Sequence, residues 1–200
     1  MSILQKIGAH VTENGACEFT VWAPSAKSVS VEITVPKKQT LPLEKREFGY
    51  WKATLENASP ETRYFINLNH ETKRPDPASL SQPDGVHEAS ALVDHHTFNW
   101  TDEDWKSISL ENLIIYELHT GTFTSQHNFE GIIQKLDYLL ELGINAIEIM
   151  PVAQFPGERN WGYDGVYPFA VQNSYGGPEG LKKQINDCHA KGIAVVLDVV

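Results

Sequence analysis

Residues 151–175, PVAQFPGERNWGYDGVYPFAVQNSY, are the stretch that decides how the C-terminal half of this chain is organised. They follow a short apolar run, residues 146–150 (AIEIM), which predicts a buried strand, and they precede a predicted helix at residues 176–191. Loops longer than roughly 12–15 residues inside a compact domain are usually functional or disordered. Five side chains of this loop are aromatic: Phe155, Trp161, Tyr163, Tyr167 and Phe169. So aromatic a composition disfavours disorder.

The chemistry of the loop suits a flat ligand that carries many hydroxyl groups. The C–H faces of a sugar ring pack on aromatic side chains, while its hydroxyls need polar partners such as Glu158, Arg159 and Asp164. The alternative is that the aromatic side chains only close the end of a sheet. The residues alone leave both interpretations open.

The flanking sequence predicts alternating strands and helices. Residues 113–118, 146–150 and 193–200 are near-continuous apolar runs, as in parallel strands covered on both faces. Residues 129–140 repeat apolar side chains along one helical face. Asn128 is placed to cap that helix, and Gly143 and Gly192 to end the two helices. The order β–α–β–loop–α–β requires right-handed parallel crossovers.

The N-terminal half has a different pattern. Residues 17–23, 28–35, 49–55 and 62–68 each alternate apolar and polar side chains, which predicts half-buried strands separated by turns. Several short strands without helical periodicity indicate an antiparallel β-sandwich. Trp22 and Trp51 are expected to face its core or a domain junction.

A proline-rich connector, residues 73–107, is expected to lie docked on the surface. His95 and His96 are adjacent and point apart in extended chain, so no metal site is predicted. We therefore expect two domains, residues 1–107 with this connector and residues 108–200, and no cofactor.

Composition narrows the classes of partner. The chain has 200 residues and a net charge of −10, which disfavours a nucleic acid or an anionic membrane as partner. No stretch has the length of a membrane span or a signal-peptide core, so the cytoplasm is the expected location. Cys17 and Cys188 are expected to be reduced, partly buried thiols. Because no turn, cap or polar residue follows the last apolar strand, we expect the chain to be the N-terminal portion of a longer protein.

With these residues described, the chain resembles the α-amylase superfamily of glycoside hydrolases, and within it the malto-oligosyltrehalose trehalohydrolases. The resemblance is carried by YELHTGTFT (residues 116–124), by residues 135–182 including WGYDGVYPFA, and by GIAVVLDVV (residues 192–200). Branching enzymes tend to carry glutamine where this chain has Asp164. The connector is also similar, although Glu88 stands where the family pattern suggests glycine.

The resemblance implies a multidomain fold: an early-set, immunoglobulin-like sandwich followed by the first three β/α units of a TIM (β/α)8 barrel, incomplete within this chain. It implies an enzyme that releases trehalose by hydrolysing the α-1,4 bond next to a terminal trehalose unit. Its partner would be an α-1,4-glucan or malto-oligosyltrehalose. The catalytic carboxylates of the family would lie beyond residue 200, so the chain alone is expected to be inactive.

By resemblance, Tyr163 stacks beneath the sugar ring before the scissile bond, and Asp164 beside it orients a basic partner or a hydroxyl. Trp161 either flanks the same subsite or only packs the loop, and Asp164 could instead cap a turn. Gly162 and Gly165 would allow the tight path that exposes Tyr163. Asp198 begins a D-V-V motif and supports the site, whereas three polar strand residues are expected to be structural: Glu117, His119 and Glu148.

Three alternatives stay open. A glycogen branching or debranching enzyme would use the same chemistry. A non-catalytic glucan-binding module would use the sandwich as the binder. An interaction domain could also reuse the front end of an amylase.

Overall fold

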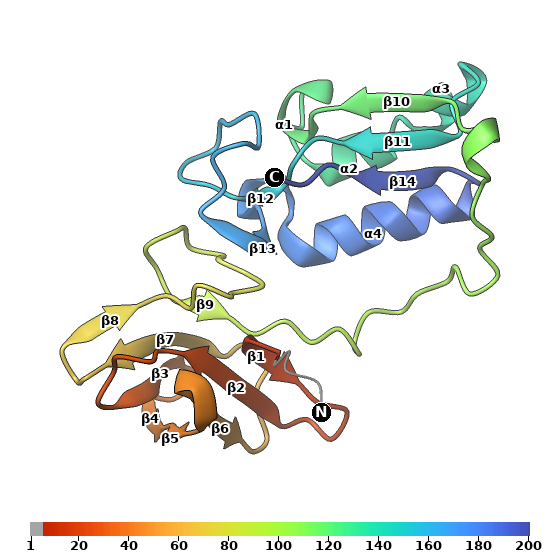
Figure 1. Ribbon diagram of the computed structural model, residues 1–200. Helices are drawn as coiled ribbons and strands as arrows, with labels where there is room; N and C mark the ends of the chain where they lie inside the picture. Colours follow the sequence, from red (N-terminus) through yellow and green to blue (C-terminus); the bar gives the residue numbers. More distant parts are fainter. Residues whose placement is uncertain (1–5) are drawn as a thin grey trace. The chain divides into compact units, whose positions relative to one another are not determined.

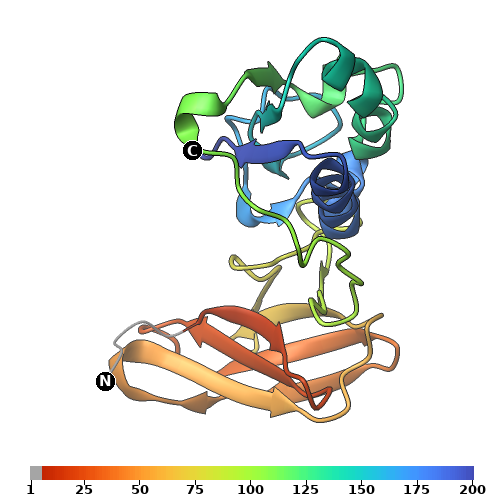
Figure 2. The same ribbon diagram turned by 90° about the vertical axis from the view of Figure 1, so that its right-hand side faces the viewer.

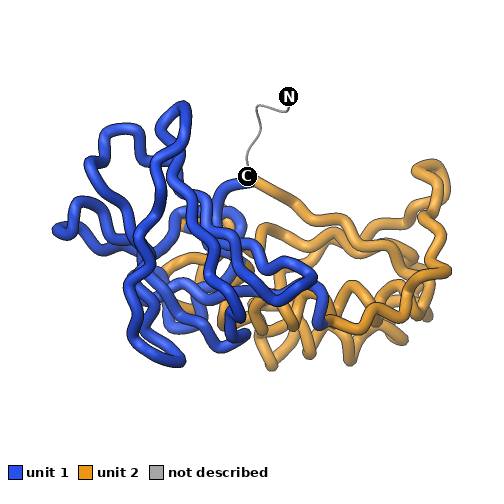
Figure 3. Tube along the Cα trace, turned by 90° about the horizontal axis from the view of Figure 1, so that it is seen from below, with its two compact units in different colours: residues 1–97, 167–170 blue, residues 98–166, 171–200 orange. Residues whose placement is uncertain are grey.

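The computed structural model describes residues 6–200, so residues 1–5 of the predicted sandwich range lie outside the described part of the chain. The described chain divides into two compact units (Figure 3). Unit 1 contains the sandwich up to residue 97 together with residues 167–170, and unit 2 contains residues 98–166 and 171–200.

Unit 1 is the antiparallel β-sandwich, and its two sheets stack as layers (Figure 2). The first sheet has the order β1-β2-β6-β5: Gly8–Val11, Cys17–Trp22, Tyr50–Leu55 and Glu44–Lys45. The second has the order β4-β3-β7-β8, with β9 paired to β7: Gln39–Pro42, Val29–Val35, Arg63–Leu68, Thr72–Arg74 and Ser90–Ala91. A short 3-10 turn, η1, spans Glu47–Gly49.

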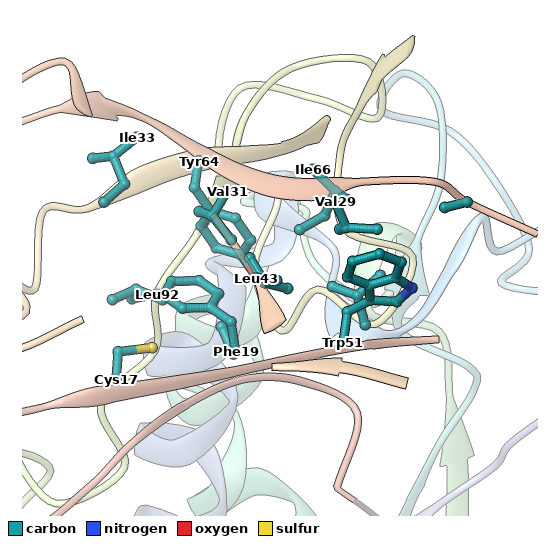
Figure 4. Packing of buried hydrophobic residues seen from close by; sticks show 13 residues of the cluster. Cys17, Phe19, Val29, Val31, Ile33, Leu43, Trp51, Tyr64, Ile66 and Leu92 are labelled. Carbon is teal, nitrogen blue, oxygen red and sulfur yellow. The ribbon is translucent and has the colours of Figure 1, made fainter. Parts of the chain in front are cut away.

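The four strands that alternation predicted are confirmed as β2, β3, β6 and β7. Their inward side chains form one core between the sheets, in which Phe19 packs edge to face on Tyr64 with ring centroids 5.1 Å apart (Figure 4). Trp51 is buried in this core, as expected. Trp22 is not: its side chain is 61% exposed. The strands of unit 1 that the sequence missed, β1, β4, β5, β8 and β9, are two to four residues long, which is too short to show alternation.

One polar group is buried beside this core. The Tyr64 hydroxyl donates to Oδ2 of Asp76 at 2.8 Å, and Oδ1 of Asp76 accepts from the backbone N–H of Ala78. Burial raises the pKa of the Asp76 carboxyl and, more strongly, that of Tyr64. These bonds satisfy the carboxyl where water cannot reach it, and they tie the start of the connector to the sandwich.

Unit 2 is built on a parallel sheet of three strands in the order β10-β11-β14 (Figure 1). They span Ile115–Leu118, Ala146–Ile149 and Ala194–Leu197. All three apolar runs are therefore confirmed as parallel strands. Two short strands lie within the long loop, β12 at Ala153–Gln154 and β13 at Tyr167–Val171. Two 3-10 turns, η2 and η3, span Leu110–Asn112 and Asn173–Tyr175.

The helices follow the predicted order with one correction. The helix expected over residues 129–140 is two helices, α2 (Phe129–Ile133) and α3 (Leu136–Glu141), because Lys135 leaves helical geometry at φ −106° and ψ 1°. A short α1 (Thr120–Phe123) precedes them, and α4 (Gly177–Ala190) precedes β14.

The expected helix ends are confirmed. The Asn128 side chain accepts from the N–H of Gly131 at 3.0 Å, which caps α2. Gly143 and Gly192 have φ values of 87° and 76°, in the left-handed region that glycine adopts without strain.

The helices cover one face of the parallel sheet, and α4 lies along β14 (Figure 1). Leu118, Ile147 and Ile149 point to that side and are buried against Phe129, Ile132, Leu136 and Cys188. On the opposite face, Ile115 and Val196 are exposed in unit 2. The strands are thus covered on one face within the described residues, not on both.

Both cysteines are free and buried, as the sequence predicted, and burial raises the pKa of each thiol to about 12. None of the helices in residues 6–200 has the length and apolar character needed to cross a membrane.

Candidate functional site

The long loop brings its central tyrosine to the carboxyl edge of the parallel sheet. The Tyr163 hydroxyl donates to Oδ2 of Asp198 at 3.2 Å, and Asp198 directly follows β14. Two residues that are 35 positions apart therefore meet where β14 ends. The Tyr163 ring remains 51% exposed, so its face is available to a ligand.

Two glycines fix the path that presents this ring. Gly162 has φ 100°, and a Cβ built on it would lie 2.3 Å from the carbonyl oxygen of Pro151. A Cβ on Gly165 would lie 2.7 Å from the Cβ of Ala153. The loop passes too close to the backbone of Pro151 at Gly162, and to the side chain of Ala153 at Gly165, for any larger side chain at these two positions. The tight path predicted for Gly162 and Gly165 is confirmed.

Three carboxylates face the hydroxyl of Tyr163. Glu117 lies opposite Glu148 in the parallel register, and Glu148 lies opposite Val196, two residues before Asp198. Side chains that alternate along a strand share a face, so all three carboxylates lie on the side away from the helices. The hydrogen bond to Asp198 raises the pKa of Tyr163, and the charges of Glu117 and Glu148 add to the rise. Tyr163 is therefore held in its neutral form as a hydrogen-bond donor.

Asp164 lies beside the tyrosine but points to a different partner. Its Oδ2 accepts from Nδ2 of Asn160 at 3.1 Å, and Oδ1 of Asn160 accepts from the N–H of Gly162 at 2.7 Å. These two hydrogen bonds link Asp164, Asn160 and Gly162 and so hold the loop around Tyr163 in place. The carboxylate is exposed and keeps lone pairs free for another donor.

Trp161 belongs to a neighbouring cleft of about 700 Å³. Its indole is 66% exposed and its ring lies 5.3 Å from the ring of His119. The cleft is lined by polar and aromatic side chains from the loops after β10 and β11: His119, Thr122, Gln126, His127, Glu158, Arg159, Asn160, Trp161 and Ser174. Tyr163 does not line it. The structure thus brings Tyr163 and Asp198 together and places Trp161 in an adjoining cavity.

His119 is a residue of this region to which the sequence assigned only a structural role. Its Nε2 lies 2.7 Å from the carbonyl oxygen of Asn160, and its Nδ1 lies 3.1 Å from Oγ1 of Thr122. A carbonyl only accepts, so Nε2 carries the proton in this bond. His119 therefore joins the loop after β10 to the loop after β11. The sequence signal for a functional role of His119 was its position directly after the apolar run at residues 113–118.

No three His, Cys, Asp or Glu side chains within residues 6–200 gather in a way that would hold a metal ion. The polar groups described above can hydrogen-bond a neutral ligand, while Tyr163 and Trp161 offer it aromatic faces.

Comparisons with known proteins give the family of the chain. The family described as "Alpha amylase, catalytic domain" matches residues 94–200, and "Carbohydrate-binding module 48 (Isoamylase N-terminal domain)" matches residues 6–81. The chain is 49% identical to a malto-oligosyltrehalose trehalohydrolase of Saccharolobus solfataricus, over 96% of this chain and 34% of that protein. It thus spans about a third of the length of the curated relatives it matches.

Solved structures show the same similarity. A Salmonella typhimurium protein assigned provisionally as an alpha amylase superposes with a TM-score of 0.91 at 37% identity, covering 98% of this chain and 33% of that one. A pullulanase of Anoxybacillus sp. LM18-11, solved with maltotriose, superposes with a TM-score of 0.81 at 25% identity, covering 100% of this chain and 34% of that one. Since more than half of the residues match its catalytic-domain profile, this chain belongs to the alpha-amylase family, and a carbohydrate-binding module 48 precedes its catalytic-domain part.

Proposed function

We propose that the intact protein is a trehalose-releasing glycoside hydrolase, which cuts the α-1,4 bond next to the terminal trehalose unit of malto-oligosyltrehalose. The observation that carries this proposal is the 49% identity over nearly the whole chain to a relative named for that activity. The Asp at position 164 in the WGYDG string supports it, because the resemblance to trehalohydrolases rather than branching enzymes rests on this residue.

In this proposal Tyr163 is the platform of the site. A sugar ring would stack on its exposed face, and stacking of this kind contributes on the order of 1 kcal/mol. Asp198 accepts a hydrogen bond from the hydroxyl end of the ring at 3.2 Å, which favours this orientation of the platform. Asp164 would accept from a sugar hydroxyl, and Trp161 would contact a more distant part of the substrate from the adjoining cleft.

The chemical step needs two further carboxyl groups. A glycosidase uses one carboxylic acid to protonate the leaving oxygen and a second carboxylate as nucleophile or base. Glu117, Glu148 and Asp198 lie toward the hydroxyl end of Tyr163, and we assign them supporting roles. The acid and the nucleophile would come from further strands of a closed barrel, which would also cover Ile115 and Val196.

We also propose the domain division expected from the sequence, residues 1–107 with the connector and residues 108–200. The cytoplasmic location, and the absence of nucleic-acid and membrane partners, stay predictions. Limited proteolysis that cuts first near residue 107 would support the division.

Product analysis tests the proposed function. The intact protein, incubated with malto-oligosyltrehalose, is expected to release free trehalose, and the 200-residue chain alone to release none. Maltoheptaose is the matched control substrate, because it lacks the trehalose end. Release of maltose or transfer of glucan branches in place of trehalose would instead favour the branching or debranching alternative.

A further inference from the structure

The loop that presents Tyr163 is held in place by side chains outside it. Residues 155–166, between β12 and β13, form bends, turns and irregular chain. Within this stretch Tyr163 donates to Asp198, and the carbonyl oxygen of Asn160 accepts from Nε2 of His119 at 2.7 Å. His119 follows β10 and the loop follows β11, so both lie at the same end of the parallel sheet (Figure 1).

The imidazole of His119 is a fixed point, because packing and hydrogen bonds hold it on several sides. With the proton on Nε2, Nδ1 accepts from the hydroxyl of Thr122 in α1 at 3.1 Å. The ring of the buried Tyr175 meets it edge to face with centroids 6.0 Å apart, and Tyr175 packs in the same way on Phe129. A Cβ built on Gly121 would lie 3.0 Å from Cε1 of His119, so the backbone of α1 closes another side.

Asn160 connects this fixed point to the backbone around Tyr163. Its carbonyl oxygen is bound by His119, while its side chain bonds the residues on either side of Tyr163. Oδ1 of Asn160 accepts from the N–H of Gly162 at 2.7 Å, and Nδ2 donates to Oδ2 of Asp164 at 3.1 Å. A shift of Asn160 would therefore displace the chain both before and after the tyrosine.

His119 has no ring nitrogen left over for a ligand. It lines the cleft that contains Trp161, but Nε2 is bonded to Asn160 and Nδ1 to Thr122. A role in binding a hydroxyl or transferring a proton would need one of these bonds to break. The arrangement therefore favours a role that His119 exerts through the loop.

We propose that His119 is a positioning residue of the sugar site, which acts through Asn160 to place the Tyr163 ring against Asp198. The identity of the sugar rests on the proposed function, whereas the placement of Tyr163 does not. Placement matters because a misplacement of about 1 Å, even from a change away from the reacting atoms, can cost on the order of a hundredfold in rate.

The titration of Tyr163 reports its placement, because the bond to Asp198 raises its pKa. Phenolate absorbance of the intact protein, taken as each variant minus the same variant with Tyr163→Phe, isolates this group. His119→Leu removes the donor to Asn160 and should bring the titration back toward the ordinary pKa of about 10. His119→Gln keeps an N–H donor on a side chain of similar reach and should leave the titration late.

Asn128→Ala is the control for a general loss of stability. It removes the cap of α2 without touching the loop, so the Tyr163 titration should stay late. A residue that only stabilised the fold would behave in the same way as Asn128, whereas a positioning residue moves the titration.

A double-mutant cycle on the intact protein tests whether His119 acts through Tyr163. His119→Leu alone should lower kcat/KM for malto-oligosyltrehalose by about tenfold or more, and His119→Gln should retain most of it. In a Tyr163→Ala background the same His119→Leu change should cost less than about threefold further, because the ring that it positions is already absent.

Several results would overturn this role for His119. A late Tyr163 titration in folded His119→Leu would do so, as would an undiminished loss of kcat/KM in the Tyr163→Ala background. Failure of His119→Gln to restore the titration would also do so. If His119→Leu does not fold, Asn160→Ala replaces it, because it breaks the bonds to Gly162 and Asp164 and leaves His119 in place. A late titration in Asn160→Ala would then contradict the proposal.

The proposed function and this role fail separately. An intact protein that releases no trehalose would contradict the proposed function. The Tyr163 titration needs no substrate, so it would still decide whether His119 positions the ring.

Discussion

At the scale of single residues, the path of the loop depends on where a side chain can fit. Gly162 and Gly157 both have positive φ, 100° and 77°, yet only Gly162 faces an obstruction. Nothing lies within 4 Å of a Cβ built on Gly157, whereas the Pro151 carbonyl blocks one on Gly162. The pair therefore separates backbone strain from steric overlap within one loop.

Gly162→Ala is expected to destabilise the chain by about 2–4 kcal/mol, from left-handed strain plus overlap with Pro151. Gly157→Ala should show the strain alone, about 1–2 kcal/mol. Urea unfolding of the 200-residue chain measures both free energies of unfolding. Equal losses in the two variants would mean that the close approach at Pro151 does not constrain the loop.

The hydrogen bond between Tyr163 and Asp198 predicts a pH dependence. The folded-state pKa of Tyr163 is raised. The hydrogen bond to Asp198 therefore contributes to folding stability at neutral pH, and this contribution is lost as the pH rises through the raised pKa. Phenolate absorbance, taken as parent minus Tyr163→Phe, should therefore show a late titration. Asp198→Asn should bring it back toward the ordinary pKa of about 10. If the pKa of Tyr163 stays the same in Asp198→Asn as in the parent, the carboxylate does not act on the tyrosine.

At the scale of elements, periodicity predicted the strands and helices that carry strong apolar patterns. β2, β3, β6, β7, β10, β11 and β14 were all expected, as were the capping roles of Asn128, Gly143 and Gly192. Short polar strands such as β4 and β5 were missed because they form by pairing with a neighbouring strand and their own sequences carry little strand signal. The break between α2 and α3 was missed because the apolar stripe continues across Lys135.

The cap of α2 gives a prediction at this scale. Asn128→Ala is expected to cost about 1 kcal/mol, because the N–H of Gly131 loses its acceptor, and Asn128→Asp should retain most of the stability. Thermal unfolding of the two variants beside the parent gives the comparison. If Asn128→Ala melts with the parent, packing of Phe129 and Ile132 rather than the cap holds the helix start.

At the scale of the whole molecule, each of the two compact units exposes an aromatic side chain, Tyr163 in unit 2 and Trp22 in unit 1. In unit 2, Tyr163 lies at the carboxyl edge of a parallel sheet, and the sequence predicted its exposure through the glycines on either side. In unit 1, Trp22 was expected in a core or a junction because its indole is large and apolar, although alternation with the core residues Phe19 and Val21 places it on the opposite face of β2. The sequence also could not predict that Trp161 lies apart from the Tyr163–Asp198 pair, because Trp161 and Tyr163 are only two positions apart in one short motif.

The central claim is that Tyr163 is the sugar platform of a trehalose-releasing hydrolase, and steady-state kinetics of the intact protein test it most directly. Tyr163→Phe keeps the ring and should retain most of kcat/KM for malto-oligosyltrehalose. Tyr163→Ala removes the ring and should lower kcat/KM by about tenfold or more. Parent-like trehalose release by Tyr163→Ala would contradict the account.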